Sequence, residues 1–160
     1  MKMPLSFRTA RKEDIPAILN LLSQVLEVHA TVRPDLFISG TTKYDEKELA
    51  EKLDREDERI FVALNDAGDV IAYAFCVIQD GIAARCIVPR RTFYIDDFCV
   101  SEKSRGRGVG KALFNYVKHE AELLDCYDIT LNVWEGNDSA RKFYENVGMK
   151  PEKTQMEYIL

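Results

Sequence analysis

The chain has 160 residues, enough for one well-cored domain and too few for two of ordinary size. Its net charge of −5 argues against broad nucleic-acid binding and suits a cationic partner such as an amine. No uninterrupted apolar run approaches the roughly 20 residues of a membrane span, and the N-terminus lacks the pattern of a signal peptide. We therefore expect one domain over residues 1–160, with neither a membrane nor a nucleic acid as partner.

The cysteines and histidines indicate no metal site. The four cysteines are widely spaced and form no C-x-x-C pair. His29 and His119, the two histidines, have no ligand spacing to them. This pattern predicts reduced thiols, no bound metal and a cytoplasmic protein. The cysteines are Cys76, Cys86, Cys99 and Cys126.

The first half of the chain predicts three strands and two helices. Apolar residues recur at helical spacing between positions 15 and 26, which indicates a helix that begins at Glu13 and ends at His29. Asp45 and Glu48 have the spacing of a capping box, so a second helix is expected over 45–54. A turn-rich sequence between two β-rich runs predicts a hairpin. The expected strands are 5–9, 59–64 and 70–79.

The second half alternates strands and helices. Strands are expected at 92–100, 129–133 and 153–159, and helices at 109–124 and 139–147. Early hairpins followed by β-α-β units predict an α/β fold. We expect a mixed, mostly antiparallel central sheet of six to seven strands, with about four helices distributed over both faces.

A glycine-rich loop stands between a predicted strand and a long predicted helix. Unpaired N–H groups and the partial positive charge at a helix N-terminus attract phosphate, and glycines let the backbone approach a bulky anion. The alternative is a loop that merely turns a strand into a helix. Neither the Rossmann nor the P-loop spacing is present. The residues are Arg105, Gly106, Arg107, Gly108, Val109, Gly110 and the following Lys111.

Two spaced motifs resemble those of the GNAT superfamily of N-acetyltransferases. Arg105-x-x-Gly108-x-Gly110 resembles the R/Q-x-x-G-x-G/A signature, and residues 137–149 resemble N-x-x-A-x-x-F-Y-x-x-x-G-F. The resemblance implies a single GNAT domain and acetyl-CoA as the co-substrate, with its pyrophosphate in the glycine-rich loop.

The resemblance also implies how the rest of acetyl-CoA is held. Its pantetheine arm would lie between the strands at 92–100 and 129–133, which splay apart. The arm would pair with the main chain of Phe98, Cys99 and Val100, and a backbone N–H near Cys99 or Val100 would stabilise the oxyanion. Asn137 would hold the cofactor. Tyr144 would protonate the leaving thiolate, although it also suits the apolar side of a helix.

Asp96 and Asp97 are the candidates for a general base, because a protonated amine must lose a proton before it attacks. Neighbouring strand residues point to opposite faces, so at most one would face the acceptor unless a bulge intervenes. This stretch resembles the diamine acetyltransferase branch, which has an acidic pair here. The alternative is that either Asp pairs with an Arg or caps a loop. Asn132 replaces the Glu used by N-terminal acetylating enzymes of ribosomal proteins, and an amide cannot act as a base.

The acceptor site is the least defined part of the prediction. His29, Phe37, Asp96 and Trp134 are the candidate substrate contacts. A hydrogen-bonded structural role is favoured for His29, and Phe37 and Trp134 are equally plausible as core residues. Cys99 would lie near the thioester, but a packing role is favoured over an acyl-cysteine intermediate.

We expect an acyltransferase that moves acetyl from acetyl-CoA directly to a primary amine of a small molecule, such as a polyamine or an amino acid. The alternatives are a protein N-terminal or lysine acetyltransferase and a non-catalytic CoA-binding regulatory module. Homodimers are common in the family, so the resemblance leaves the chain as a monomer or a homodimer.

Overall fold

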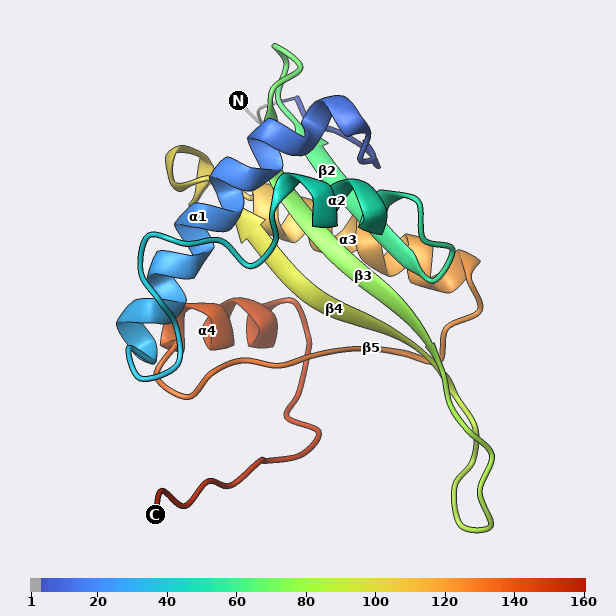
Figure 1. The fold of residues 1–160 in the computed structure, drawn as a ribbon. Coiled ribbons are helices and arrows are strands. Elements are labelled where there is room, and N and C mark those ends of the chain that lie inside the picture. The colour runs from blue at the N-terminus through green and yellow to red at the C-terminus, as the bar shows by residue number, and fades with distance from the viewer. Residues whose placement is uncertain (1–3) are drawn as a thin grey trace.

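The hairpin-forming sequences in the middle of the chain build the centre of a five-stranded sheet (Figure 1). The computed structural model describes residues 4–160. The strands follow one another in chain order across the sheet; the first three pairings are antiparallel, and β4 and β5 are parallel. The strands are β1 (Ser6–Thr9), β2 (Glu58–Leu64), β3 (Val70–Asp80), β4 (Arg91–Val100) and β5 (Asp128–Leu131).

The expectation of six to seven strands was wrong for the described chain. The sequence pattern of 153–159 suits a strand, but residues 149–160 have no regular secondary structure. A strand forms only where a neighbouring strand accepts its backbone hydrogen bonds, and this segment finds none within residues 4–160. The other five strands are confirmed, with shifts of one or two residues at their ends.

The prediction of four α-helices on both faces is confirmed. Two short 3₁₀ turns, η1 (Lys12–Asp14) and η2 (Glu102–Ser104), precede α1 and the glycine-rich loop. The first helix runs three residues beyond its expected end at His29. Asp45 and Glu48 form the expected capping box at the start of α2, with Asp45 Oδ1 accepting from the Glu48 N–H at 2.8 Å. The helices are α1 (Ile15–Val32), α2 (Glu46–Leu53), α3 (Val109–Leu123) and α4 (Asp138–Asn146).

The sheet separates two apolar cores because successive strand residues point to opposite faces. Val62 and Tyr73 face α1 and α2, where Leu22 is fully buried against them. Phe61 and Phe93 face α3 on the other side. Partly buried residues pack against the core on the α3 side. They include Phe143 of α4 and Val147, the C-terminal cap of α4.

The long helical segment at residues 12–32 has the length and mean hydropathy, 1.3, that a membrane span also requires. Its apolar residues have another use in this fold. Ile18, Leu22 and Leu26 are buried in the core between α1 and the sheet. The apolar composition of the helix is therefore explained by packing.

A partly buried ion pair joins β1 to the start of the first helix. Arg8 donates to the two carboxylate oxygens of Asp14 at 2.6 and 2.9 Å, and the Arg11 N–H donates to the same carboxylate at 2.7 Å. Asp14 is 5% exposed. The hydrogen bond from Arg8 outweighs the effect of burial and lowers the pKa of Asp14 below its usual 3.8.

Replacing Asp14 with Asn should lower the free energy of unfolding at pH 7 by about 2 kcal/mol, because it leaves the partly exposed Arg8 with no carboxylate partner. A carboxyl whose folded-state pKa is lowered stabilises the fold above its unfolded-state pKa, and this stabilisation is lost as pH falls through the folded-state pKa. The difference between wild type and variant in urea unfolding should therefore shrink below pH 4. Exposed Asp66→Asn is the control. A constant difference from pH 7 to pH 2.5 would contradict this role.

Candidate active site

A bulge in β4 decides the direction of its two acidic side chains. The register with β3 places Asp97 opposite Phe75 and Ile95 opposite Cys76, so Asp96 is an extra residue in β4. An extra residue interrupts the alternation of faces. Asp96 and Asp97 consequently both point toward α1 and α2, whereas strict alternation predicted that only one of them would.

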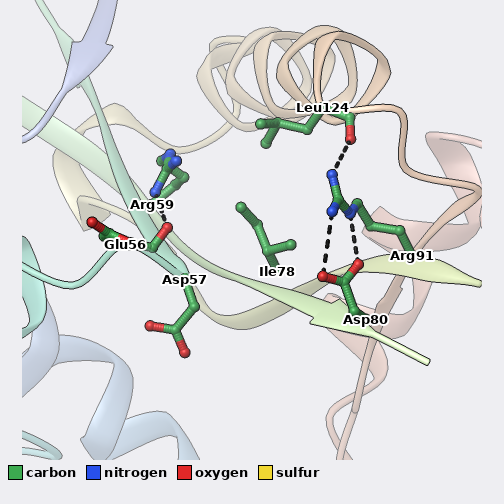
Figure 2. A pocket seen from close by; sticks show the side chains of 7 residues that line it. All are labelled: Glu56, Asp57, Arg59, Ile78, Asp80, Arg91 and Leu124. Atoms are coloured by element: carbon green, nitrogen blue, oxygen red, sulfur yellow. Dashed lines mark hydrogen bonds and ion pairs between the residues drawn. The ribbon is translucent and has the colours of Figure 1, made fainter. Parts of the chain in front are cut away.

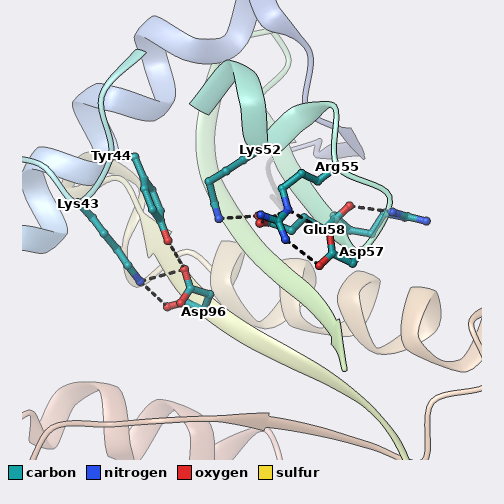
Figure 3. A network of polar contacts seen from close by, with 8 residues as sticks. Lys43, Tyr44, Lys52, Arg55, Asp57, Glu58 and Asp96 are labelled. Atoms are coloured by element: carbon teal, nitrogen blue, oxygen red, sulfur yellow. Dashed lines mark hydrogen bonds and ion pairs between the residues drawn. The ribbon is translucent and has the colours of Figure 1, made fainter. Parts of the chain in front are cut away.

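The two carboxylates have different surroundings on that shared face. Asp96 Oδ2 accepts hydrogen bonds from the Tyr44 hydroxyl at 2.6 Å and from Lys43 Nζ at 2.9 Å (Figure 3). Asp97 is 8% exposed and accepts a hydrogen bond from the Tyr73 hydroxyl at 3.3 Å. One acid is therefore part of a surface ion pair, and the other is buried beside a tyrosine.

These surroundings shift the two pKa values in opposite directions. Burial raises the pKa of Asp97 to about 6, with the charge of Lys43 opposing the shift and that of Asp96 adding to it. Burial also acts on Asp96, but hydrogen bonds from Tyr44 and Lys43 outweigh it and lower its pKa. Near neutral pH Asp97 can therefore gain and lose a proton, while Asp96 stays ionised.

The strands β4 and β5 separate next to the acidic pair. Their parallel pairing runs from Thr92 opposite Asp128 to Ile95 opposite Leu131 and includes no later residue. Residues 96–100 of β4 therefore have no strand neighbour on that side within the described chain. This matches the splayed strands expected from the sequence.

The backbone groups facing this opening belong to Phe98 and Val100. The Ser101 N–H donates to the Ile71 carbonyl at 2.8 Å across the pairing with β3. Because backbone groups alternate along a strand, Cys99 shares that orientation and directs its N–H and carbonyl to β3. The expectation that the Cys99 backbone faces the opening was therefore wrong.

The glycine-rich loop presents an open helix N-terminus. Gly106 and Gly108 have φ angles of 73° and 80°, where a side chain would be strained, and a Cβ on either would meet no atom within 4 Å. The first backbone bond of α3 runs from the Ala112 N–H to the Gly108 carbonyl, so the N–H groups of residues 109–111 precede the helical ladder. The N-terminus of α3 therefore combines open space, unpaired N–H donors and the positive end of the helix dipole.

The side chains that flank the loop are either exposed to solvent or bound to the backbone. Arg107 and Lys111 are exposed, and the Nε of Arg105 donates to the Val100 carbonyl at 3.0 Å. Gly110 has a packing role, since a Cβ there would lie 3.1 Å from the ring of Phe143. The expected close approach of an anion is thus supported at positions 106 and 108, and Gly110 instead lets α3 and α4 pack.

Two of the predicted site residues belong to α4 and its N-terminal cap. Asn137 caps the helix, with its Oδ1 accepting from the Ala140 N–H at 3.2 Å. Tyr144 is half-buried, with its ring 6.2 Å from that of Phe98. Burial, together with the charge of Asp97, raises the pKa of Tyr144 above its usual 10.0. The hydroxyl therefore keeps its proton at neutral pH.

The candidate acceptor residues form one aromatic cluster. The His29 ring lies 5.2 Å from Phe37, which meets Trp134 edge-on at 5.6 Å. Arg33 stacks over the Trp134 ring at 5.4 Å. Burial and then the charge of Lys43 lower the pKa of His29, so it is neutral at pH 7. The structure thus brings together residues that the sequence could only propose one by one.

The chain matches the family described as Acetyltransferase (GNAT) family over residues 25–149, more than three quarters of its length. The chain belongs to the GNAT acetyltransferases. Members of the family are N-acetyltransferases that use acetyl-CoA, so this chain is an acyltransferase.

This GNAT chain is similar to known acetyltransferases and to a solved bacterial protein. A segment of 58 residues is 33% identical to the spermine/spermidine N(1)-acetyltransferase of Bacillus subtilis and covers 36% of this chain and 38% of that relative. The BH1408 protein of Bacillus halodurans, solved as a point mutant, is 28% identical, with a TM-score of 0.93 over 97% of this chain and 99% of that one. The aminoglycoside N-acetyltransferase AAC(6')-Iy in complex with CoA, at 18% identity and a TM-score of 0.72 over 100% and 97%, shares the fold.

Three contacts of the GNAT site were missed in the sequence. Lys43 and Tyr44 lie in the connection before α2 and bind Asp96, 52 or more residues away. Tyr73 lies on β3 and binds Asp97. No local pattern links these pairs, because the contacts depend on strand register. The Asn132 amide donates to the Tyr94 hydroxyl at 3.1 Å.

The thiol of Cys99 is directed into the core. Its Sγ lies 3.5 Å from the Leu21 carbonyl of α1, and burial raises its pKa to about 12. A protonated thiol is a poor nucleophile, so the geometry favours packing over an acyl-cysteine intermediate. Within residues 4–160, no group of three or more His, Cys, Asp or Glu side chains is placed to hold a metal ion.

A hollow of about 370 Å³ at the far end of β3 and β4 contains none of the predicted site residues (Figure 2). Its two arginine side chains are engaged with Asp80 or with the backbone, and Asp57 pairs with Arg55 outside the hollow. Arg91 pairs with Asp80 at 2.7 Å and donates to the Leu124 carbonyl, and Arg59 donates to the Glu56 carbonyl. These contacts explain the polar lining without a ligand.

Replacing Gly110 with Ala should destabilise the protein, although Ala favours helices by about 1 kcal/mol over Gly. The new Cβ would press on Phe143, whose ring is held between Phe98 and Tyr144 at 5.6 and 5.1 Å. Thermal unfolding should show a lower Tm, and calorimetry weaker CoA binding.

The matched control is the same substitution in a Phe143→Leu background, where the smaller side chain removes the contact. There, Gly110→Ala should raise the Tm. If the substitution has the same effect in both backgrounds, the packing role of Gly110 is wrong.

Proposed function

We propose that this GNAT enzyme transfers acetyl directly from acetyl-CoA to a primary amine of a small cationic molecule. The observation that carries the proposal is the bulge at Asp96, which turns two carboxylates to one face beside the opening between β4 and β5. Adjacent negative charges at that point attract an ammonium group.

In this proposal Asp97 is the general base. The pKa of about 6 allows it to accept the proton of the incoming ammonium near neutral pH. Asp96 is kept ionised by Tyr44 and Lys43 and serves to hold positive charge. The amine nitrogen then forms the new N–C bond to the acetyl carbonyl carbon.

Tyr144 is the proposed acid. As the C–S bond breaks, its hydroxyl gives a proton to the departing thiolate. The nitrogen loses its second proton, which restores the Tyr144 hydroxyl through solvent, and Asp97 releases the first proton to solvent. The N–H groups of Phe98 and Val100 face the opening and are candidate donors to the oxyanion. The donors at the start of α3, with Arg107 and Lys111, suit the pyrophosphate.

A small polyamine-like acceptor is favoured over a protein. Lys43 already places a primary ammonium against the Asp96 carboxylate and carbonyl, at 2.9 and 3.2 Å, and 5.5 Å from the centre of the Tyr44 ring. This arrangement supports recognition of an aliphatic ammonium. The partial similarity to a spermine/spermidine acetyltransferase points the same way.

The direct test measures thiol release from acetyl-CoA with a panel of polyamines, amino acids, aminoglycosides and short peptides. Polyamines should give the highest kcat/KM, and Tyr144→Phe should slow their turnover while CoA binding is kept. A preference for peptides would favour the protein acetyltransferase alternative and contradict the proposal.

The role of Asp97 predicts the pH dependence of kcat/KM. Activity should fall as pH drops through about 6, because a protonated carboxyl cannot accept a proton. Asp97→Asn should lower kcat by about 10²-fold or more and remove the fall in kcat/KM on the acidic side of the profile, measured between pH 5 and 8. Asp96→Asn is the matched control, and it should weaken acceptor binding while kcat/KM still falls at acidic pH. If kcat/KM still falls at acidic pH in Asp97→Asn, another group is the base.

Lys43 should compete with a cationic acceptor for Asp96. Lys43→Met should lower the acceptor KM by about five-fold, the equivalent of the ~1 kcal/mol that a partly exposed ion pair contributes. Lys43→Arg keeps the charge and should leave KM high, and exposed Lys47→Met is the surface control. A rise in KM for Lys43→Met would mean that Lys43 helps to bind the acceptor instead.

A further inference from the structure

Tyr73 on β3 carries a hydroxyl in the middle of an apolar core. The residue is 0% exposed, and its ring packs among apolar side chains between the sheet and the first two helices. A hydroxyl taken out of water costs free energy unless it finds a hydrogen-bond partner. Phe75, two residues along the same strand, fills the same core with a plain ring that meets Tyr73 edge-on at 4.9 Å. The core therefore needs the ring, and the hydroxyl requires a separate explanation.

The hydroxyl has one hydrogen-bond partner within residues 4–160, the carboxylate of Asp97. Its oxygen lies 3.3 Å from Asp97 Oδ1. Tyr73 is opposite Cys99 in the pairing of β3 with β4, so Asp97 is its diagonal neighbour on the same face. Burial, followed by the charge of Asp97, raises the pKa of Tyr73 well above its usual 10.0. The hydroxyl therefore stays protonated and acts as the donor in this contact.

The packing of the ring fixes the position of this donor. Tyr73 lies within β3, which pairs with β2 on one side and with β4 on the other. Leu22 of α1, which is fully buried, belongs to the same core. A side chain whose rotamer is held by packing presents its polar group at one place. The hydroxyl is therefore a fixed point for the Asp97 carboxylate beside the opening between β4 and β5.

The contact gives the two oxygens of Asp97 different roles. Within the described chain, a side-chain donor binds Oδ1 and none binds Oδ2. If a transferred proton stood on Oδ1, that O–H would have to donate to Tyr73, and the hydrogen of Tyr73 would be left in the core without an acceptor. An unpaired buried donor is costly. The protonated form of Asp97 therefore carries its hydrogen on Oδ2.

We propose that Tyr73 positions the general base of this enzyme: its hydroxyl holds Oδ1 of Asp97 and leaves Oδ2 to accept the proton of the incoming ammonium. The N–H bond of the ammonium breaks and an O–H bond forms at Oδ2, so the nitrogen keeps the electron pair with which it attacks the acetyl carbon. Tyr73 is a positioning residue, because it acts through Asp97. The inference rests on the proposed role of Asp97 as the base.

The titratable groups that face Asp97 come from β3, β4, α4 and the connection before α2. Lys43 and Asp96 act on the pKa of Asp97 through their charges, in opposite directions. The other groups are neutral near pH 6, because burial raises the pKa of each. They are Tyr44, Tyr73, Cys99 and Tyr144.

Tyr73→Phe keeps the ring and removes the hydroxyl. A hydrogen bond to the ionised form of a carboxyl favours that form, so its loss should raise the pKa of Asp97. The midpoint of the acidic fall in kcat/KM should therefore move upward by about 0.5–1 pH unit. At about pH 8.5, where most of Asp97 is ionised in both proteins, the rate of a single turnover should still fall about five-fold, because the carboxylate is no longer held in place.

Replacing Tyr73 with 3-fluorotyrosine tests the same contact in the opposite direction. The fluorine makes the hydroxyl a stronger donor, so the pKa of Asp97 and the acidic fall in kcat/KM should move to lower pH. A purely structural role of Tyr73 would not give opposite shifts for two such similar side chains. Tyr116→Phe is the matched control, because it removes a tyrosine hydroxyl next to the core on the α3 side. This control should leave the midpoint and the single-turnover rate unchanged.

A carboxyl-carbon NMR titration of Asp97 gives a measurement that does not depend on activity, and thermal unfolding checks that each variant is folded. An Asp97 pKa that is the same in wild type and Tyr73→Phe would overturn the inference and leave the role of Asp97 intact. A shifted pKa with an unchanged single-turnover rate would also overturn it, because Tyr73 would then tune the acid without positioning it. An acidic fall that persists in Asp97→Asn would remove the proposed base, and with it this inference.

Discussion

One extra residue in the fourth strand sets the chemistry of the site. Without the bulge at Asp96, the alternation of a strand would send Asp96 and Asp97 to opposite faces, and the core behind β4 would have to bury a carboxylate. With it, Phe93 and Ile95 fill one core, Cys99 fills the other, and both acids emerge on the side of α1 and α2. The same point marks where β4 and β5 separate.

The residues that contact Asp96 and Asp97 give these two acids different environments. Lys43 and Tyr44 reach Asp96 from the connection before α2, and Tyr44 is itself stacked on Phe75 and approached by Lys52 at 4.6 Å. Lys52 in turn pairs with buried Glu58 at 2.6 Å (Figure 3). The position of Tyr44, and through it the charge state of Asp96, therefore depends on how α2 is fixed to β2.

Much of this protein could be predicted where the signal is local. The glycines at 106 and 108, the capping residues Asp45 and Asn137, and the helical periodicity of α1 and α3 each depend on a few neighbouring residues, and the structure confirms the elements they define. The spacing of Arg105 and Gly108 and the motif that begins at Asn137 resemble the GNAT signatures, and the family match confirms this resemblance. The backbone direction at Cys99 and the packing of Gly110 on Phe143 were not predictable, because each depends on a neighbour far along the chain.

The sequence by itself determined the α/β class and the order of the elements up to α4, and it predicted a phosphate site at the start of α3 and the residues capable of acid–base chemistry. Only the tertiary structure decided which way those residues point. Side-chain direction in a strand is set by register, and register is set by pairing with other strands, so Asp97 meets Tyr73 and Asp96 meets Lys43 only in the assembled sheet. The same reason explains the C-terminal segment, whose sequence suits a strand but which finds no partner strand within residues 4–160.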